Sequence, residues 1–508
     1  MVAGGTPPTT HHPLNSTRQF PKTHYSIYFI EDIQIWQWLL VIASSLLLFA
    51  VAPLARTAAE FFGGRKADRA PMTIALISSL VISWLFAKSI TNAANLGLAF
   101  GLVGGVAYGA YYLSFAVAGW VIYRMRTVGG FTSIHHFLGE RFGRPAMLLF
   151  TLLICFRLFN EVWSNTMVIG SYFGGVGDVG YYAAILVFTA LTLAYSLKGG
   201  MSSSILTDVI QMAFFGVLIT VILLAILPRV DYEVGPIITS GEWTMAAGGN
   251  LLLVALLQSF SYPFHDPVMT DRGFLSDPKT TLKAFLWAAP IGFVCILLFS
   301  VVGVYGQTVG VSGQAPVEVG KLLGGPILLV INFIMVTSAA STLDSTFTSF
   351  AKLSVVDLGA KTRVRAKVQG VDSQSISYFS KSPNEPSVRH GRLAMIAITL
   401  LGTLPVFLNP AILSATTVSG AMVAGLAPVF CLWSVKAPPL SFWLSVGFGL
   451  LCGFALVFGW WPESLVFTEG VYAELLGVTI VEVIGCFALY GLGILMGNSG
   501  RVHKYHSI

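Results

Sequence analysis

Charged residues are scarce in this sequence, and their scarcity excludes most soluble proteins. Only 10% of the 508 residues are Asp, Glu, Lys or Arg, whereas 55% are hydrophobic. This is the composition of a polytopic membrane protein. The five cysteines lie in apolar stretches and form no CxxC pair, so neither a disulfide framework nor a zinc site is indicated. HExxH, GxSxG and P-loop motifs are absent as well. We therefore expect a protein that is not an enzyme and has no enzyme cofactor.

Long apolar segments recur along the chain, about thirteen of them at spanning length, which predicts an all-α polytopic membrane protein. We expect these parts: an external tail over 1–32, a peripheral transmembrane helix at 33–54, helical cores at 71–227 and 248–433, a cytoplasmic loop at 358–391, two peripheral helices within 440–496, and a cytoplasmic tail over 497–508.

The 29 Lys and Arg residues fall mainly in alternate connecting segments, which sets the expected orientation. With the N-terminus outside and the C-terminus in the cytoplasm, few basic residues lie in the external segments: Arg18, Lys22, Arg229 and Lys321. The formal net charge of +6 comes from loops between apolar spans. We therefore expect a lipid bilayer as partner, not nucleic acid, and a multi-pass protein of the cell membrane.

One apolar segment, residues 335–357, is unusually rich in hydroxyl groups. Ser338, Ser341, Thr342 and Ser345 recur at i, i+3, i+4 and i+7, so they share one face of a helix. Lipid offers no hydrogen-bond partner to such a face, so protein, water or an ion must do so. Oxygen ligands suit a hard cation such as Na⁺. The alternative is close helix packing, for which Ser and Thr are common.

Five motifs occur in chain order that together resemble the sodium:solute symporter family, and they lie mostly between about residue 60 and residue 435. They are FFGGRKADRAP (61–71), FTSIHHFLGERFG (131–143), YSLKGGMSSSILTDVIQMAFF (195–215), DPVMTDRGFLSD (266–277) and STLDSTFTSF followed by VVD (341–357). The resemblance leans toward the proline and amino-acid branch, and it implies an inverted-repeat bundle of the leucine-transporter type. Core helices one to five would lie in 71–227 and six to ten in 248–433, with the first and sixth broken. Pro263 and Pro267 are placed to interrupt the sixth.

By the same resemblance, a coupling sodium ion would sit between the first and eighth core helices. Its ligands would be the backbone carbonyls of Ser78, Val81 and Ser338 and the hydroxyls of Ser341 and Thr342.

Two carboxylates accompany this predicted sodium site. Asp208 resembles an acidic position near the inner exit of the ion, although it could instead cap a helix. Asp344 lies on a neighbouring face of the hydroxyl-rich helix and could tune the site or cap a partner. If transport were driven by protons, Asp208, Asp344 or Glu161 could carry the proton, although the Ser341 and Thr342 pair argues against this alternative.

The third core helix carries three polar residues four positions apart, Arg157, Glu161 and Asn165. They share one face, and Arg157 can pair with Glu161. Charges within a span are costly, so we expect this face to point into the bundle. Glu161 and Asn165 are candidates for lining a solute cavity.

Three further residues are candidates for the solute site. Trp84 matches an aromatic residue of some amino-acid-transporting relatives, with packing as the alternative. Lys88 could bind an anionic solute, pair with Asp266 or Glu161, or extend toward the membrane surface. Asp266 follows the expected break in the sixth helix and could bind a solute amine or hydroxyl, or neutralise Lys88.

These observations lead to one functional hypothesis. We expect a Na⁺-coupled secondary symporter that imports a small organic solute, with an amino acid or carboxylate favoured, by alternating access. Proton coupled or Na⁺-independent transport, or a sensor derived from a transporter, are the alternatives.

Overall fold

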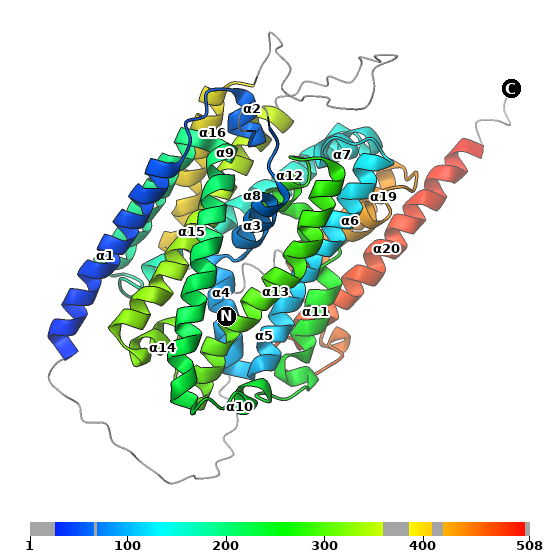
Figure 1. Cartoon of the computed structure of the whole chain (residues 1–508). Helices are drawn as coiled ribbons and strands as arrows, with labels where there is room; N and C mark the ends of the chain where they lie inside the picture. Colours follow the sequence, from blue (N-terminus) through cyan, green and yellow to red (C-terminus); the bar gives the residue numbers. More distant parts are fainter. Residues whose placement is uncertain (1–25, 66–68, 359–385, 409–419, 503–508) are drawn as a thin grey trace.

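The computed structural model describes residues 26–65, 69–358, 386–408 and 420–502. Within these residues the regular elements are all helices, which confirms the all-α prediction. Many long helices lie side by side, and short helices such as α2 and α7 gather at one end of the bundle (Figure 1).

The helices before residue 227 begin with one leading helix and continue into the first core region. They are α1 (Ser26–Val51), α2 (Ala58–Gly63), α3 (Thr73–Trp84), α4 (Ala87–Phe100), α5 (Leu102–Gly109), η1 (Ala110–Tyr112), α6 (Leu113–Thr127), α7 (Ile134–Phe142), α8 (Arg144–Gly170) and α9 (Val179–Ile226).

The helices after residue 226 include several short elements. They are η2 (Leu227–Val230), α10 (Gly235–Ile238), η3 (Met245–Gly249), α11 (Asn250–Gln258), η4 (Tyr262–His265), α12 (Pro267–Arg272), α13 (Pro278–Thr308), α14 (Ala315–Leu323), α15 (Gly325–Lys352), η5 (Leu353–Asp357), α16 (Val388–Thr403), η6 (Leu404–Leu408), α18 (Leu426–Cys431), α19 (Pro439–Val457), η7 (Glu463–Leu465) and α20 (Ala473–Val502).

In the described part of the chain, nine helices are long and apolar enough to cross a membrane, or up to ten if the bent pair α3–α4 counts as one span. α9 has 48 residues and would measure about 72 Å if straight, more than twice the thickness of a bilayer core. Gly200 interrupts it with φ 55° and ψ −140°. The expected span within 411–433 and the loop 358–391 fall partly outside the described residues. The total of about thirteen spans therefore stays a prediction.

The first core helix is broken, as the resemblance implied. α3 and α4 meet at a bend of 61°. No proline or glycine lies at this bend, so the sequence pattern alone did not locate it. The backbone carbonyl of Trp84, freed by the bend, accepts a hydrogen bond from the Tyr112 hydroxyl at 2.8 Å. A buried carbonyl left without a partner would be costly, so Tyr112 stabilises the break.

The sixth core helix is broken at the predicted prolines. α11 ends at Gln258, and α12 starts only at Pro267, with η4 between them. Asp266 is the N-cap of α12, and its Oδ1 accepts the backbone N–H groups of Val268 at 2.9 Å and Met269 at 3.3 Å. The break is therefore held by a side chain that satisfies the donors at the start of the following helix.

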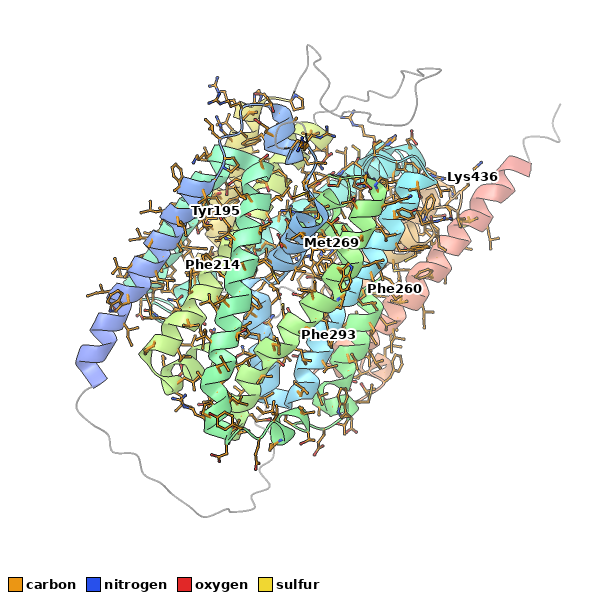
Figure 2. All side chains as sticks on the ribbon, viewed as in Figure 1. Tyr195, Phe214, Phe260, Met269, Phe293 and Lys436 are labelled. Atoms are coloured by element: carbon orange, nitrogen blue, oxygen red, sulfur yellow. The ribbon has the colours of Figure 1, made fainter. Side chains whose placement is uncertain are left out.

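α15, the hydroxyl-rich helix, lies at the centre of the bundle. In its most apolar stretch 72% of the residues are buried, against 22% in α1 and 33% in α20. The Tyr195 hydroxyl of α9 donates to the Ala340 carbonyl of α15 at 3.0 Å. Figure 2 shows side chains filling the space between neighbouring helices, with Tyr195 and Met269 among those buried inside. Polar side chains of α15 must therefore find partners within the protein.

Candidate functional site

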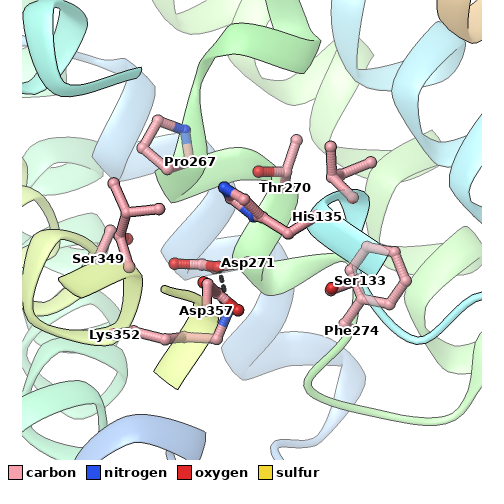
Figure 3. A pocket seen from close by; sticks show the side chains of 11 residues that line it. Ser133, His135, Pro267, Thr270, Asp271, Phe274, Ser349, Lys352 and Asp357 are labelled. Carbon is pink, nitrogen blue, oxygen red and sulfur yellow. Dashed lines mark hydrogen bonds and ion pairs between the residues drawn. The ribbon is translucent and has the colours of Figure 1, made fainter. Parts of the chain in front are cut away.

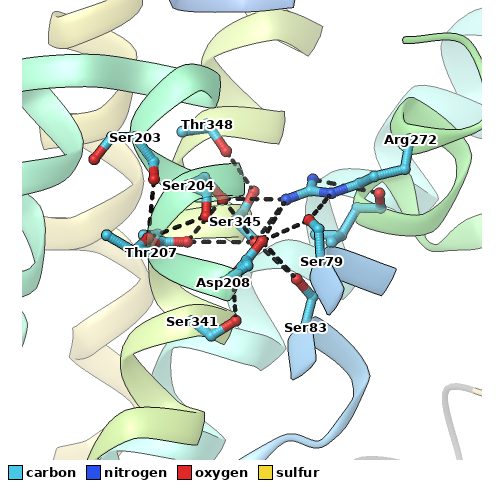
Figure 4. A network of polar contacts seen from close by, with 12 residues as sticks. Ser79, Ser83, Ser203, Ser204, Thr207, Asp208, Arg272, Ser341, Ser345 and Thr348 are labelled. Atoms are coloured by element: carbon cyan, nitrogen blue, oxygen red, sulfur yellow. Dashed lines mark hydrogen bonds and ion pairs between the residues drawn. The ribbon is translucent and has the colours of Figure 1, made fainter. Parts of the chain in front are cut away.

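A buried cluster of hydroxyls and carboxylates joins α3, α9 and α15 (Figure 4). Asp208 of α9 is fully buried, and its two oxygens accept from the Ser79 and Ser341 hydroxyls, each at 2.5 Å. Ser83 of α3 lies 3.0 Å from Ser345 of α15, oxygen to oxygen. Asp208 lies well inside α9, which excludes the helix-capping alternative. It is instead the shared acceptor between the first and eighth core helices.

The second carboxylate of this cluster is Asp344 on α15. It is fully buried and accepts from Ser204 and Thr207 of α9, each at 2.9 Å. It also accepts from the neighbouring Ser345 at 3.3 Å. Asp344 therefore ties α15 to α9 by hydrogen bonds, and it does not cap a helix.

Arg272, the last residue of α12, extends into the same cluster, and the sequence reasoning had not singled it out. It is fully buried, and its Nε donates to Ser79 at 3.0 Å. Its Nη2 donates to Ser345 at 2.8 Å and to Ser204 at 3.1 Å, and lies 3.6 Å from Asp208. The signal that could have identified it is that Arg272 is the one arginine in the motif DPVMTDRGFLSD, which follows the break in the sixth core helix.

The formal charge of the cluster does not balance. Asp208 and Asp344 carry two negative charges when ionised, and Arg272 supplies one positive charge. One net negative charge buried in low dielectric is unfavourable unless it is paired. A monovalent cation, either Na⁺ or a proton, would restore balance. This requirement comes from the described residues themselves and does not depend on any resemblance.

The predicted sodium ligands lie at the edge of this cluster. Ser341 and Thr342 are buried, and the Thr342 hydroxyl donates to the Ser338 carbonyl at 2.9 Å. A hydroxyl that donates its proton keeps lone pairs that can bind a cation. The Val81 carbonyl accepts the Leu85 backbone N–H at 2.9 Å, in the last turn before the bend.

Ser338 and Ser78 were expected to bind sodium through their backbone carbonyls. The Ser338 hydroxyl has no hydrogen-bond partner among the described residues, although the prediction concerned its carbonyl. Ser78 lies on α3 and is half-buried. Oxygen atoms from α3 and α15 are thus close to the charged cluster, and their role as ligands remains a prediction.

A second buried cluster contains the predicted solute residues. Lys88 of α4 pairs with Glu161 of α8 at 2.8 Å, one of the two pairings expected for it, and its contact with a solute stays a prediction. Arg157 also pairs with Glu161, as expected from their spacing, and its Nη2 lies 3.2 Å from Asp266. The Trp84 indole N–H donates to the same Asp266 oxygen at 2.9 Å. All five side chains are buried, and the two cations balance the two carboxylates.

Asparagines complete the surroundings of Lys88. Its ammonium donates to Asn160 at 3.1 Å, and its backbone N–H donates to Asn165 at 3.1 Å. The Asn165 amide donates to Glu161 at 2.8 Å. The predicted solute residues are therefore brought together at the bend between α3 and α4, beside the break before α12.

Comparisons with known proteins agree with the motifs. No family model matches the chain. A stretch of 157 residues, 30% of this chain, is 27% identical to sodium/glucose cotransporter 4 of Mus musculus and 28% identical to that of Homo sapiens. Sodium/glucose cotransporter 1 of Mus musculus is 26% identical over 155 residues. The matched stretch spans only 22% or 23% of the length of these relatives.

The structure resembles that of a Na⁺-coupled sialic acid symporter, solved in a substrate-bound outward-open state, with a TM-score of 0.60. The alignment covers 91% of this chain and 98% of that one, at 16% sequence identity, so this likeness concerns the fold. The chain therefore has the fold of this symporter, the leucine-transporter-type arrangement that the motifs implied. It is a multi-pass membrane protein.

Proposed function

We propose that this protein is a Na⁺-coupled secondary symporter that imports a small organic solute by alternating access. The observation that carries the proposal is the unbalanced negative charge around Asp208 and Asp344, buried among hydroxyls beside a bent core helix. Transporters of this architecture bind solute and ion near the midplane, where broken helices expose backbone groups. The relatives named above support sodium as the ion.

The proposed sodium ligands are those expected from the resemblance: the carbonyls of Ser78, Val81 and Ser338 and the hydroxyls of Ser341 and Thr342. Asp208 and Asp344 would supply negative charge close to the ion. Arg272 would hold Asp208 in place and would limit the site to a single added charge.

The proposed solute site is the cluster of Lys88, Glu161 and Asp266, with Trp84 and Asn165 beside it. An amino acid or a carboxylate is favoured, because a solute carboxylate could replace Glu161 or Asp266 as a partner of Lys88 or Arg157. Asp266 already accepts four hydrogen bonds, so it has little capacity left for a solute amine. Because Asp266 is already occupied in this way, we expect the site to recognise the carboxylate end of a solute.

The available energy is sufficient for accumulation. One Na⁺ crossing about 100 mV contributes roughly 2.3 kcal/mol, and a tenfold gradient adds about 1.4 kcal/mol. Together, roughly 3.7 kcal/mol would sustain about 500-fold accumulation of a neutral solute at perfect coupling.

We also propose that 71–227 and 248–433 form the two inverted repeats, with the N-terminus outside and the C-terminus cytoplasmic.

Thermal stability of the purified protein would test the proposal across a panel of solutes, each in Na⁺ and in K⁺. A ligand that binds only the native state raises the melting temperature by mass action. A solute whose stabilising effect requires Na⁺ supports coupled symport. An equal effect in K⁺ contradicts it and favours proton coupling, for which the adjacent carboxylates Asp208 and Asp344 are the candidate carriers.

A further inference from the structure

An ion pair separate from both clusters connects α12 to the end of α15 (Figure 3). The Lys352 ammonium binds Asp271 of α12 and lies 3.5 Å from Asp357 of η5. The three side chains are 15%, 9% and 8% exposed, respectively. They are close enough to the surface to separate into water, yet buried enough for the pairing to matter.

A small polar cavity adjoins this ion pair. It has about 10 Å³ of space for the centre of a water molecule, enough for about one water. Ser133 and His135 line it from the start of α7, and Ser349 lines it from α15. His135 Nε2 is buried and has no hydrogen-bond partner among the described residues, and the buried Ser349 hydroxyl lies beside Asp271. The cavity is thus a narrow space between α7, α12 and α15, and the ion pair joins the last two of these helices.

Consecutive residues of α12 connect this ion pair to the candidate sodium site. Arg272 extends into the Asp208 cluster, whereas Asp271 binds Lys352. α12 has only six residues and follows the non-helical interruption of the sixth core helix, so it is a short element that can move relative to α11. Adjacent residues thus join α12 to two helices: Asp271 pairs with Lys352 of α15, and Arg272 contacts Asp208 of α9 and donates to Ser345 of α15.

We propose that the Lys352–Asp271 pair is an ionic latch that holds α12 against α15. While it is closed, the Asp208 cluster is shut off from the end of the bundle where α2 and α7 lie. When the pair separates, α12 can move away, Arg272 leaves the cluster, and water enters through the cavity beside Ser349. The role of this latch in ion release depends on the proposed symport function; the latch itself does not.

Alkylation of a cysteine placed in the cavity tests the latch. Ser349→Cys is close in size to the serine it replaces, and every variant is compared with the Ser349→Cys protein, so any effect of the thiol on Asp271 is common to all. Peptide-resolved mass spectrometry after treatment with N-ethylmaleimide measures the rate at position 349 alone, so the five native cysteines can remain. In this background, Lys352→Met should raise the alkylation rate about tenfold or more, because the closed state loses its ion pair.

Two further variants separate a latch from general damage. Lys352→Met with Asp271→Asn removes the pair without leaving Asp271 as an unpaired charge, and should give a similar increase. The exchanged pair, Asp271→Lys with Lys352→Asp, should restore slow alkylation when Asp357→Asn is added, so that residue 352 does not face a second carboxylate. The matched control is Lys321→Met, which breaks an exposed ion pair with Glu318 on α14, at the opposite end of the bundle, and should leave the rate unchanged.

The outcomes distinguish this inference from the proposed function. An unchanged rate in both Lys352→Met variants, an equal rise in the Lys321→Met control, or fast alkylation in the exchanged pair would overturn the latch. The measurement is made without solute, in Na⁺ and in K⁺. Rates that rise as expected but ignore Na⁺ in every variant would support the latch and count against sodium coupling.

Discussion

Replacing Asp208 by asparagine would remove the unbalanced charge on which the sodium proposal depends. Asp208 shares the cluster with Asp344 and Arg272, so the substitution changes the formal charge of the cluster from −1 to zero. Asparagine keeps the size of the side chain and one acceptor oxygen, so one serine hydroxyl keeps its acceptor, while the other can rotate to accept from the amide nitrogen. The change is therefore mainly electrostatic.

The magnitude follows from the distance between charges. A carboxylate about 4 Å from a monovalent cation contributes about 4 kcal/mol at an effective dielectric constant of 20. Relaxation and water entry reduce this, and we expect a loss of about 2 to 4 kcal/mol in Na⁺ binding. Each 1.4 kcal/mol is a factor of ten, so the Na⁺ concentration for half-maximal effect should rise about 30-fold or more.

The assay is a Na⁺ titration of the melting temperature of the purified protein, at constant ionic strength with K⁺ as replacement. The matched control is Asp277→Asn, which changes an exposed N-cap of α13 to another good cap. The reasoning is refuted if Asp208→Asn folds and responds to Na⁺ at the wild-type concentration. A shift of equal size in Asp277→Asn would refute it as well.

Three more predictions concern other parts of the two clusters. Ser341→Ala or Thr342→Ala should raise the Na⁺ concentration needed for half-maximal uptake without unfolding the protein, and an unchanged Na⁺ dependence would contradict their role as ligands. Lys88→Met should reduce the free energy of unfolding by roughly 3–5 kcal/mol, measured as a fall in melting temperature, because it removes a partner of buried Glu161. Adding Glu161→Gln should recover part of this loss, and no recovery would argue against the pairing. Tyr112→Phe should cost about 1–3 kcal/mol, measured by thermal unfolding, because it leaves the last carbonyl of α3 without its donor.

The sequence by itself determined the features that depend on local pattern. Apolar segments of spanning length predicted a helical membrane protein, since lipid allows no unpaired backbone. Pro263 and Pro267 located the break before α12, because proline cannot donate within a helix. The i, i+3, i+4, i+7 spacing correctly placed Ser341 and Thr342 on one buried face of a helix.

The tertiary structure alone decided which distant residues meet. Lys88 had several possible partners, and only the packing of α4 against α8 selects Glu161. Asp266 was expected to bind a solute or to neutralise Lys88, whereas in the structure it caps α12, pairs with Arg157 and accepts from Trp84. Arg272 gave no periodic signal, although it is the cation that sets the charge of the Asp208 cluster. Side-chain periodicity reports which face of one helix is buried, whereas the choice of partner depends on how helices far apart in the chain pack together.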